Sequence, residues 1–541
     1  LCTAETRLNM SAYFSRDSQK TAYHPKMANW SFQDQSSILS DGLDTYPLNT
    51  SSLFNHSSLE VRKDKYEDRN NVVHSDTKHS LPSNHEETKS ITPNTPQENN
   101  YPLTTSGSST QSTVTPASPS AVNVVNGTLR ADTFTYQSGF QVVFGNGNID
   151  FGSGQRDVLD LSNIVSSAVE LNLASTKTGG VIYNPGNGNQ VFDSIKLKNN
   201  TGEVLFEGIE TIKFADTAIN LSVTPNDPLF SQQWNLHAMG VQNAWRFTTG
   251  SKNVLIGIED TGLAVNSSGQ IHSDLRSTIF SGNNYKDDLS LSPNITHGTS
   301  VQGVIAAASN NGVGITGINW NADVYHIDVM GGDAGDDDLA GATQKMIDRA
   351  NSQGQRLVIN LSLTGGYSTA WEQLIAKNQD TVLFVIAVGN TDKNSLESPA
   401  DLASKYKNAI AVGASWGTKD YYGNPKTPGE RISYDKWWGS NYGVGLTVMA
   451  PSEFPSTDAT SAPDSYNNRF NGTSASAPNV SGVASLVWSI NQGLSATQIK
   501  DIVSQTAYDL GAPGYDTVYG YGFVNADAAV RRAMALDRGV A

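Results

Sequence analysis

The sequence offers one candidate for each group that nucleophilic catalysis by a hydroxyl requires. A serine nucleophile needs a base that takes its proton, and the base needs an acid that fixes its tautomer. The reaction also needs hydrogen-bond donors where the oxyanion develops. Asp260, His297, Asn390 and Ser474 are residues of these types. We therefore predict that Asp260, His297 and Ser474 form a catalytic triad and that Asn390 donates to the oxyanion.

Each of these four residues lies where a predicted strand ends or a predicted helix begins. Asp260 ends the apolar run VLIGIED and Asn390 ends TVLFVIAVGN, whereas His297 and Ser474 open helical patterns. The carboxyl ends of parallel strands face the usual site edge of a sheet, and a helix N-terminus favours negative charge. Each motif alone has a structural explanation, such as a turn or a helix cap. The ordered set favours catalysis.

The elements around these residues predict an α/β domain over residues 223–541. Apolar runs such as VLIGIED, DVYHIDVM, LVINLSL and AIAVGA alternate with helical windows such as GTSVQGVIAAAS and DLAGATQKMIDRANSQ. Buried runs that alternate with helices indicate a mainly parallel sheet flanked by helices. About 318 residues are enough for a substantial core.

Two further regions precede this domain. Residues 128–222 contain short alternating runs broken by Gly and Asn, which predicts a small all-β domain. Residues 1–127 are polar and rich in Ser, Thr, Asn and Pro, with no apolar period over much of their length. Such a segment cannot bury enough apolar surface to offset its ordering entropy, so we expect a low-complexity, largely disordered region.

Composition excludes several classes of function. The 541 residues carry a net charge of −16, which argues against nucleic acid and anionic membranes as partners. Cys2 is the only cysteine, so the chain has no intramolecular disulfide and no Cys-based zinc site. No apolar run reaches 18 residues, which predicts no membrane span. The chain begins at Leu1 without a signal pattern, and we expect that the natural N-terminus has been removed.

From about Thr224 to its end the chain resembles the subtilisin family of serine endopeptidases. The matching stretches are IGIEDTG, HGTSVQG, NLSLTGG, VIAVGN, AIAVGA, VMAPS and NGTSASAPNVSG, and TPNDPLFSQQWNL resembles the thermitase-like branch. The resemblance implies an acyl-enzyme mechanism with an Asp-His-Ser triad, acting on protein or peptide substrates. The layout of the whole chain resembles the cyanobacterial calcium-dependent proteases.

Four positions depart from the family pattern. Ser300 stands where many relatives carry a second histidine, and Gln302 where a small residue is usual. Ala475 follows the predicted nucleophile where Met is common, and Thr364 resembles an insertion in the strand that pairs with substrate. None of these departures removes a catalytic group, but Thr364 alters the wall of the predicted cleft.

The resemblance also places the specificity pocket. It implies that Ser362 and Leu363 form one wall and that the strand from Ala387 to Gly389 forms the other, with Glu397 on the floor. A carboxylate in a partly desolvated pocket favours a paired cation, so we predict cleavage after Arg or Lys. The alternative is that Glu397 points to solvent and the enzyme has broad specificity with a preference for apolar residues.

A second acidic cluster lies in GGDAGDDDLAGA. By resemblance, this loop borders the substrate positions two and four residues before the cut. Its members are Asp333, Asp336, Asp337 and Asp338. We predict Asp338 as the substrate contact. The alternatives are a solvated charge run or acids that cap the next helix.

The segment ASNNGVGI resembles the family's strong calcium loop. By resemblance, backbone carbonyls come from Ala308, Val313 and Ile315. Side-chain oxygens come from Asn311, Asp227 and Asp274. Such oxygen ligands suit Ca²⁺, and a bound ion would stabilise the folded state by linkage.

Family members are usually made as zymogens, which predicts that residues 1–222 form a prosegment and act as an internal partner of the peptidase domain. The resemblance and the acidic composition together predict an extracellular or periplasmic location. Two other hypotheses remain open: a binding module in which the β domain docks to a partner, and a catalytically inactive scaffold. The presence of Asp260, His297, Asn390 and Ser474 argues against the inactive scaffold.

Overall fold

The computed structural model describes residues 122–540 except 266–267, 277, 282–295, 331–336, 436, 461 and 463. The disorder predicted for residues 1–127 therefore falls almost entirely outside the described residues. The first strand, β1 (Asn123–Asn126), lies inside that predicted region. It pairs in parallel with β3 (Gly139–Phe144), because the short run NVVN supplies strand-forming valines where the sheet has an open edge.

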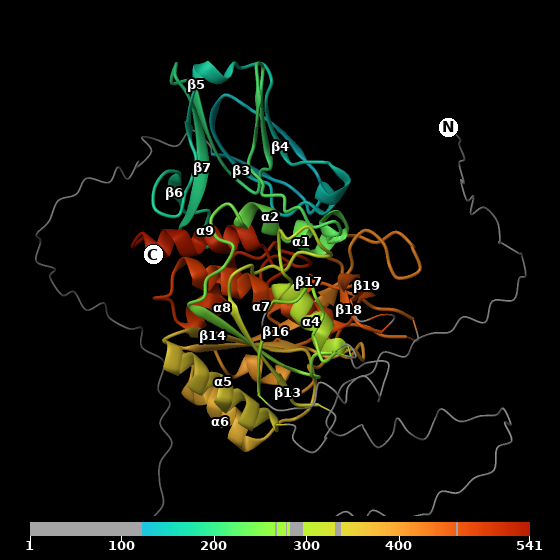
Figure 1. Cartoon of the computed structure of the whole chain (residues 1–541). Helices are drawn as coiled ribbons and strands as arrows, with labels where there is room; N and C mark the ends of the chain where they lie inside the picture. Colours follow the sequence, from blue (N-terminus) through green and yellow to red (C-terminus); the bar gives the residue numbers. More distant parts are fainter. Residues whose placement is uncertain are drawn as a thin grey trace, which may run out of the picture. The chain divides into compact units, whose positions relative to one another are not determined.

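A seven-stranded parallel sheet forms the centre of the C-terminal domain, as predicted (Figure 1). Its order is β12-β13-β11-β14-β15-β16-β17, and every neighbouring pair runs in parallel. The strands are β11 (Val254–Asp260), β12 (Thr278–Ser281), β13 (Asp323–Asp328), β14 (Arg356–Leu361), β15 (Val382–Ala387), β16 (Ala409–Ser415) and β17 (Val448–Pro451). Strands β11, β15, β16 and β17 are fully buried, which explains their nearly continuous apolar sequences.

Helices cover both faces of this sheet. Figure 1 shows α5 (Leu339–Gln353) and α6 (Thr369–Lys377) on one face, with α4 (His297–Ala306) and α7 (Thr473–Ile490) on the other. The remaining helices are α1 (Trp234–Ala238), α2 (Val241–Ala244), α8 (Ala496–Gln505) and α9 (Ala526–Asp537). Helix α7 is buried along nearly its whole length, and this fixes the position of its N-terminus.

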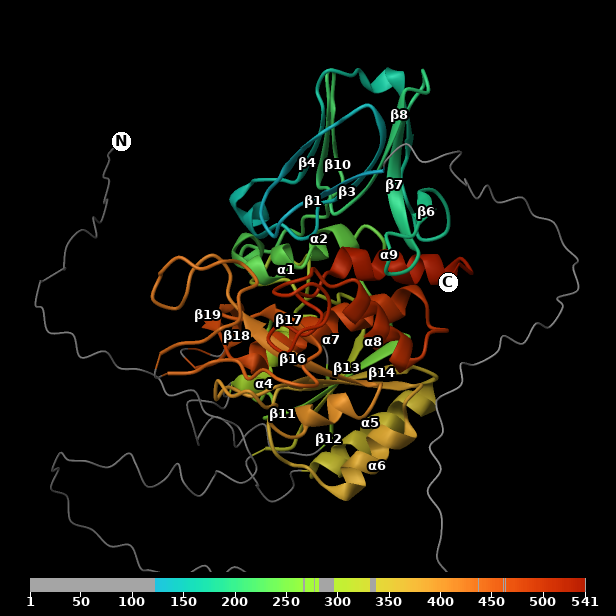
Figure 2. The same ribbon diagram turned by 180° about the vertical axis from the view of Figure 1, so that it is seen from behind.

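The expected small β domain is built from two sheets (Figure 2). One has the order β1-β3-β8-β7-β5 with β6 attached to β7, and the other has the order β10-β9-β4-β2. The strands after β1 and β3 are β2 (Thr133–Thr135), β4 (Val158–Leu161), β5 (Val169–Asn172), β6 (Val181–Tyr183), β7 (Gln190–Leu197), β8 (Gly202–Glu207), β9 (Thr211–Phe214) and β10 (Ala218–Asn220). Leu159, Val204, Phe206 and Ile212 belong to its own hydrophobic core.

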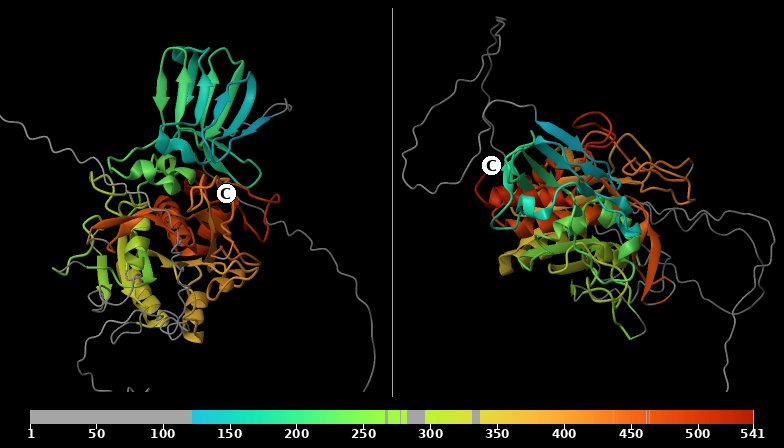
Figure 3. Two further views of the ribbon diagram at one scale, coloured as in Figure 1. Left: turned by 90° about the vertical axis from the view of Figure 1, so that its right-hand side faces the viewer. Right: turned by 90° about the horizontal axis from the view of Figure 1, so that it is seen from above.

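The β domain also shares a buried polar interface with the catalytic domain. Strand β7 packs against α9, an arrangement that Figure 3 shows from two further directions. Asp193 on β7 is fully buried and pairs with Arg246 at 2.9 Å and with Arg531 at 2.8 Å. Glu210, also fully buried, accepts a hydrogen bond from the Gln242 amide at 3.1 Å. The two domains are therefore joined by paired charges as well as by apolar packing.

Two general features of the described residues bear on function. None of their helices is both long and apolar enough to cross a membrane. The same part of the chain contains no cluster of three or more His, Cys, Asp or Glu side chains arranged to hold a metal ion.

Candidate active site

The predicted acid and base lie in direct contact. Asp260 is the last residue of β11 and is fully buried, and His297 is the first residue of α4. The Nδ1 atom of His297 lies 2.6 Å from Oδ1 of Asp260. Because a carboxylate only accepts, Nδ1 carries the hydrogen, so in a neutral ring Nε2 is the nitrogen that can take a proton.

The strand end and the helix start are also tied together through their backbones. The Thr261 N–H donates to Oδ1 of Asp260 at 2.8 Å. The Gly298 N–H donates to the hydroxyl of the same Thr261 at 2.8 Å. Thr261, the residue that follows the acid, is therefore bonded both to the acid and to Gly298, the residue that follows the base. Phe470, at the end of β19 (Ser465–Phe470), packs its ring edge-to-face on His297 at 5.7 Å between centroids.

The predicted nucleophile lies at the start of the buried helix α7. Ser474 is its second residue, and the preceding Gly472 has a φ of 91°, a conformation that favours glycine. The Ser474 hydroxyl donates to the Ser362 carbonyl at 2.9 Å, and the Ser362 hydroxyl donates to the Ser474 carbonyl at 2.8 Å. These reciprocal bonds hold the serine against the end of β14, beside the helix N–H groups that lack intrahelical partners.

Asn390 is oriented by the turn before Ser474. Its side-chain oxygen accepts hydrogen bonds from the Thr473 N–H at 2.9 Å and from the Thr473 hydroxyl at 3.0 Å. Because the Asn390 side-chain oxygen is occupied by Thr473, the amide nitrogen of Asn390 is the end that can donate a hydrogen bond to a reacting group. The arrangement thus brings a donor to the same helix start as the serine.

The predicted pocket walls lie next to one another, and Glu397 lies beside them. Leu363 and Ala387 are buried, and the Gly389 N–H donates to the Thr473 hydroxyl. A Cβ atom added to Gly389 would come within 2.6 Å of the Glu397 carboxyl carbon. The Thr391 hydroxyl donates to Oε1 of this carboxylate at 2.8 Å. The Glu397 side chain is therefore turned toward the pocket strand and is only partly exposed.

The described acids of the second cluster have local structural partners. Asp338 is the N-cap of α5, and its Oδ1 accepts from the Gly341 N–H at 2.6 Å. Asp337 pairs with Lys345 at 2.6 Å. Asp333 and Asp336 lie outside the described residues. The contact of Asp338 with Gly341 agrees with the capping alternative. A contact between Asp338 and substrate stays a prediction.

The structure also brings together the side chains of the predicted calcium loop. The Asn311 amide lies 3.1 Å from Oδ1 of Asp274, and the Asn311 N–H donates to Asp227 at 2.9 Å. The Ala308 N–H donates to the Asp274 carbonyl, the Val313 N–H to the Asn311 side chain, and the Ile315 N–H to the Asp274 carboxylate. Thus all six predicted ligand residues belong to one hydrogen-bonded unit.

The electrostatics of this loop fit a cation. Asp274 is fully buried and Asp227 is 4% exposed. Burial, together with the nearby negative charge of Asp227, raises the pKa of Asp274 to about 6. Within the described residues, neither carboxylate forms a salt bridge. Two buried carboxylates and an amide that share one small volume are hard oxygen donors suited to Ca²⁺.

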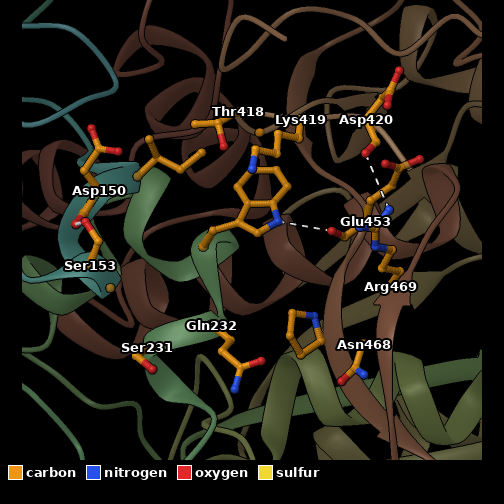
Figure 4. A pocket seen from close by; sticks show the side chains of 15 residues that line it. Asp150, Ser153, Ser231, Gln232, Thr418, Lys419, Asp420, Glu453, Asn468 and Arg469 are labelled. Carbon is orange, nitrogen blue, oxygen red and sulfur yellow. Dashed lines mark hydrogen bonds between the residues drawn. The ribbon is translucent and has the colours of Figure 1, made fainter. Parts of the chain in front are cut away.

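A cavity of about 400 Å³ was not predicted from the sequence (Figure 4). It lies between the short 3₁₀ helix Ile149–Ser153, the start of α1 and the hairpin formed by β18 (Phe454–Asp458) and β19. Trp234 lines the cavity, and its indole N–H donates to the Glu453 carbonyl at 3.1 Å. Burial raises the pKa of Glu453 to about 7. No motif around Glu453 marks this cavity in the sequence.

Comparison with known proteins places the chain in a family. The family model described as "Subtilase family" matches residues 251–522, which is 272 of 541 residues. Subtilisin DY from Bacillus licheniformis is 33% identical over 290 residues, covering 52% of this chain and 91% of the relative.

Two other relatives are matched over a smaller share of their length. Alkaline elastase YaB from Bacillus sp. is 33% identical over 282 residues, with 51% of this chain and 65% of the relative covered. An extracellular protease from Xanthomonas campestris is 31% identical over 372 residues, with 59% of each chain covered. The family match, the parallel sheet and the 2.6 Å contact of His297 with Asp260 agree, and the chain belongs to the subtilase family of serine endopeptidases.

Proposed function

We propose that this protein hydrolyses internal peptide bonds of proteins through an acyl-enzyme formed on Ser474. The Ser474 oxygen attacks the peptide carbonyl carbon while Nε2 of His297 takes the hydroxyl proton. The oxyanion accepts hydrogen bonds from the Asn390 amide and from a backbone N–H at the start of α7. His297 then gives its proton to the leaving amine, and water hydrolyses the ester by the same route. The observation that carries the proposal is the Asp260–His297 hydrogen bond of 2.6 Å.

The test uses two serines of one helix. Ser474→Ala removes the proposed nucleophile, whereas Ser476→Ala is a matched control, because the Ser476 hydroxyl donates to the Pro451 carbonyl at 3.0 Å. With a peptide library and a fluorophosphonate label, we expect S474A to lose both labelling and hydrolysis, by about 10⁴-fold or more. S476A should retain both. Unchanged hydrolysis by S474A would refute the proposed nucleophile.

The finer proposal is cleavage after Arg or Lys. It is supported by the Glu397 carboxylate, which lies against Gly389 and accepts from Thr391. At about 4 Å, one charge pair is worth about 1 kcal/mol in water and about 4 kcal/mol at an effective dielectric of about 20. Glu397→Gln should therefore lower kcat/KM for an Arg substrate about 5- to 1000-fold and leave an apolar substrate unaffected. Equal rates for both substrates in the wild-type protein would instead favour the broad, apolar specificity.

We also propose that the enzyme depends on calcium. The ion would be held by the carboxylates of Asp227 and Asp274, the Asn311 side chain and the carbonyls of Ala308, Val313 and Ile315. Bound calcium neutralises the buried acids and so stabilises the loop that follows α4. The hydrogen-bonded unit of these residues supports this assignment. Chelation should lower the thermal midpoint, and added Ca²⁺ should restore it.

We also propose that the protein is made as a zymogen and acts outside the cytoplasm. We propose that residues 1–222 serve as prosegment to the peptidase domain 223–541, with the β domain at 128–222 as their folded part. Protein substrates outside the cytoplasm, in the periplasm or the medium, suit the acidic chain, and one relative is named an extracellular protease. Incubation with calcium should release a fragment that begins near residues 215–226. Its absence from an active preparation would contradict cleavage at this boundary.

A further inference from the structure

A second buried histidine lies directly beneath the acid–base pair. His326 is on β13, pairs in register with Ile258 of β11 and is 1% exposed. Its Nε2 atom lies 2.6 Å from the Thr261 carbonyl oxygen. A carbonyl only accepts, so Nε2 carries the hydrogen and donates it.

Gln302 occupies the other nitrogen of the same ring. Nδ1 of His326 lies 3.1 Å from Oε1 of the Gln302 side chain on α4, which is itself fully buried. Burial lowers the pKa of His326, although the Thr261 carbonyl and the Asp260 charge act in the opposite direction. The neutral ring with hydrogen on Nε2 has a lone pair on Nδ1, and this lone pair requires a donor. Turning the Gln302 amide by about 180°, which exchanges its oxygen and nitrogen, supplies that donor. In that orientation Gln302 favours the tautomer that donates to Thr261.

The histidine also fits closely under the first turn of α4. A Cβ atom on Gly298 would lie 2.9 Å from Nε2 of His326 and 2.2 Å from the Thr261 carbonyl oxygen. Only a residue without a side chain allows this approach, and Gly298 immediately follows His297. Thr261 in turn receives the Gly298 N–H on its hydroxyl and donates its own N–H to Asp260. His326, Thr261 and Gly298 thus form one continuous support for both members of the pair.

We propose that His326, oriented by Gln302, is a positioning residue that sets the Asp260–His297 hydrogen bond through the Thr261 carbonyl. The inference rests on the proposed catalytic role of that pair. It explains why Gln302 is present where a small residue is usual in the family, because a small side chain would leave Nδ1 of a buried histidine without a polar partner. A positioning role predicts an effect on kcat, whereas a role in packing alone predicts an effect on stability only.

The test compares two buried histidines that each contact a backbone carbonyl. His326→Leu removes the donor to Thr261. His237→Leu is the matched control, since Nε2 of the fully buried His237 lies 3.0 Å from the Phe230 carbonyl, far along the chain from the pair. Per fluorophosphonate-labelled site of the full chain, we expect H326L to lower kcat about 10- to 100-fold with KM within about two-fold. H237L should lower the thermal midpoint but keep kcat.

Two more readouts make the result decisive. His326→Gln places an amide nitrogen near the position of Nε2 and should restore kcat to within about three-fold of wild type. Proton NMR should show a low-field resonance from the Asp260–His297 hydrogen bond that H326L shifts or abolishes and H237L preserves. This signal does not require turnover, so it still tests His326 if the wild type proves inactive and the proposed function fails. Wild-type kcat and an unmoved resonance in H326L would overturn the inference.

Discussion

The charged interface between the β domain and α9 predicts a large loss of stability when one arginine is removed. Arg531 is 1% exposed and forms ion pairs of 2.8 Å with both Asp193 and Asp527. It also donates to the Val191 carbonyl at 2.9 Å. Arg531→Met keeps most of the length and apolar volume of the side chain and removes only the guanidinium.

The size of the effect depends on which partners the buried carboxylates of Asp193 and Asp527 would keep after Arg531 is replaced. In R531M, Asp193 keeps Arg246 at 2.9 Å, but Asp527 keeps only the Gly208 N–H at 3.0 Å. Glu207 lies in the same negative cluster, and burial together with the Asp527 charge already raises its pKa to about 8. Removing one partner of a buried ion pair costs about 3–5 kcal/mol, and we expect the free energy of unfolding to fall by that amount.

The assay is urea unfolding of the full chain in an S474A background, which prevents self-digestion. Arg532→Met is the control, because Arg532 is the next residue of α9 and donates to one backbone carbonyl, that of Asn189, at 2.8 Å. R532M should cost about 0.5–1.5 kcal/mol. A double variant, R531M with Asp527→Asn, should recover part of the loss, because it removes the orphaned charge. If R531M costs no more than R532M, the buried network contributes nothing beyond an ordinary hydrogen bond.

Three further predictions concern the site and its surroundings. Asn390→Ala should lower kcat about 10²–10³-fold with little change in KM, as measured by steady-state kinetics, because it removes a donor used only in the transition state. Asp274→Asn should reduce the difference between the thermal midpoint measured with calcium and the midpoint measured with chelator, because it removes one proposed ligand. An unchanged difference would mean that calcium binds elsewhere. Glu259 is fully buried and its pKa is raised to about 8 by burial, so the folded state keeps a proton that the unfolded state releases above pH about 4.5. This one carboxyl should therefore contribute a fall in stability of about 1.4 kcal/mol per pH unit between those values, and Glu259→Gln should reduce the measured slope by that amount in denaturation between pH 5 and 8.

The sequence was sufficient to locate the four predicted site residues on their elements, because Asp260, His297 and Ser474 lie at a strand end or a helix start and Asn390 follows β15, whereas their catalytic roles stay predictions. Asp260 closes β11 and His297 opens α4, as the apolar runs and helical windows predicted. Parallel strands bring such ends to one edge, so one-dimensional order was enough to predict their proximity. The hydrogen bond between the two side chains then follows from this placement.

The parts that escaped prediction depend on pairs of residues far apart in the sequence. His326 sits in the strand DVYHID, and only its register with β11 and the approach of α4 reveal that it meets Thr261 and Gln302. Arg531 and Asp527 are four residues apart on a helix, a spacing that equally describes a solvated ion pair. What distinguishes them is burial under β7, which a single sequence does not display.

The same burial constrains how a zymogen of this architecture would work. A cut between β10 and α1 breaks the covalent link between the domains, but it leaves Asp193 paired with Arg246 and Arg531. Separating the domains would break these ion pairs and expose the apolar packing of β7 against α9, and hydrolysis of the linking peptide bond changes neither. The β domain is thus expected to stay bound after such a cut, so activation would depend on moving whatever chain occupies the cleft. Co-elution of the two fragments in gel filtration, and their separation only in denaturant, is the behaviour that this interface requires.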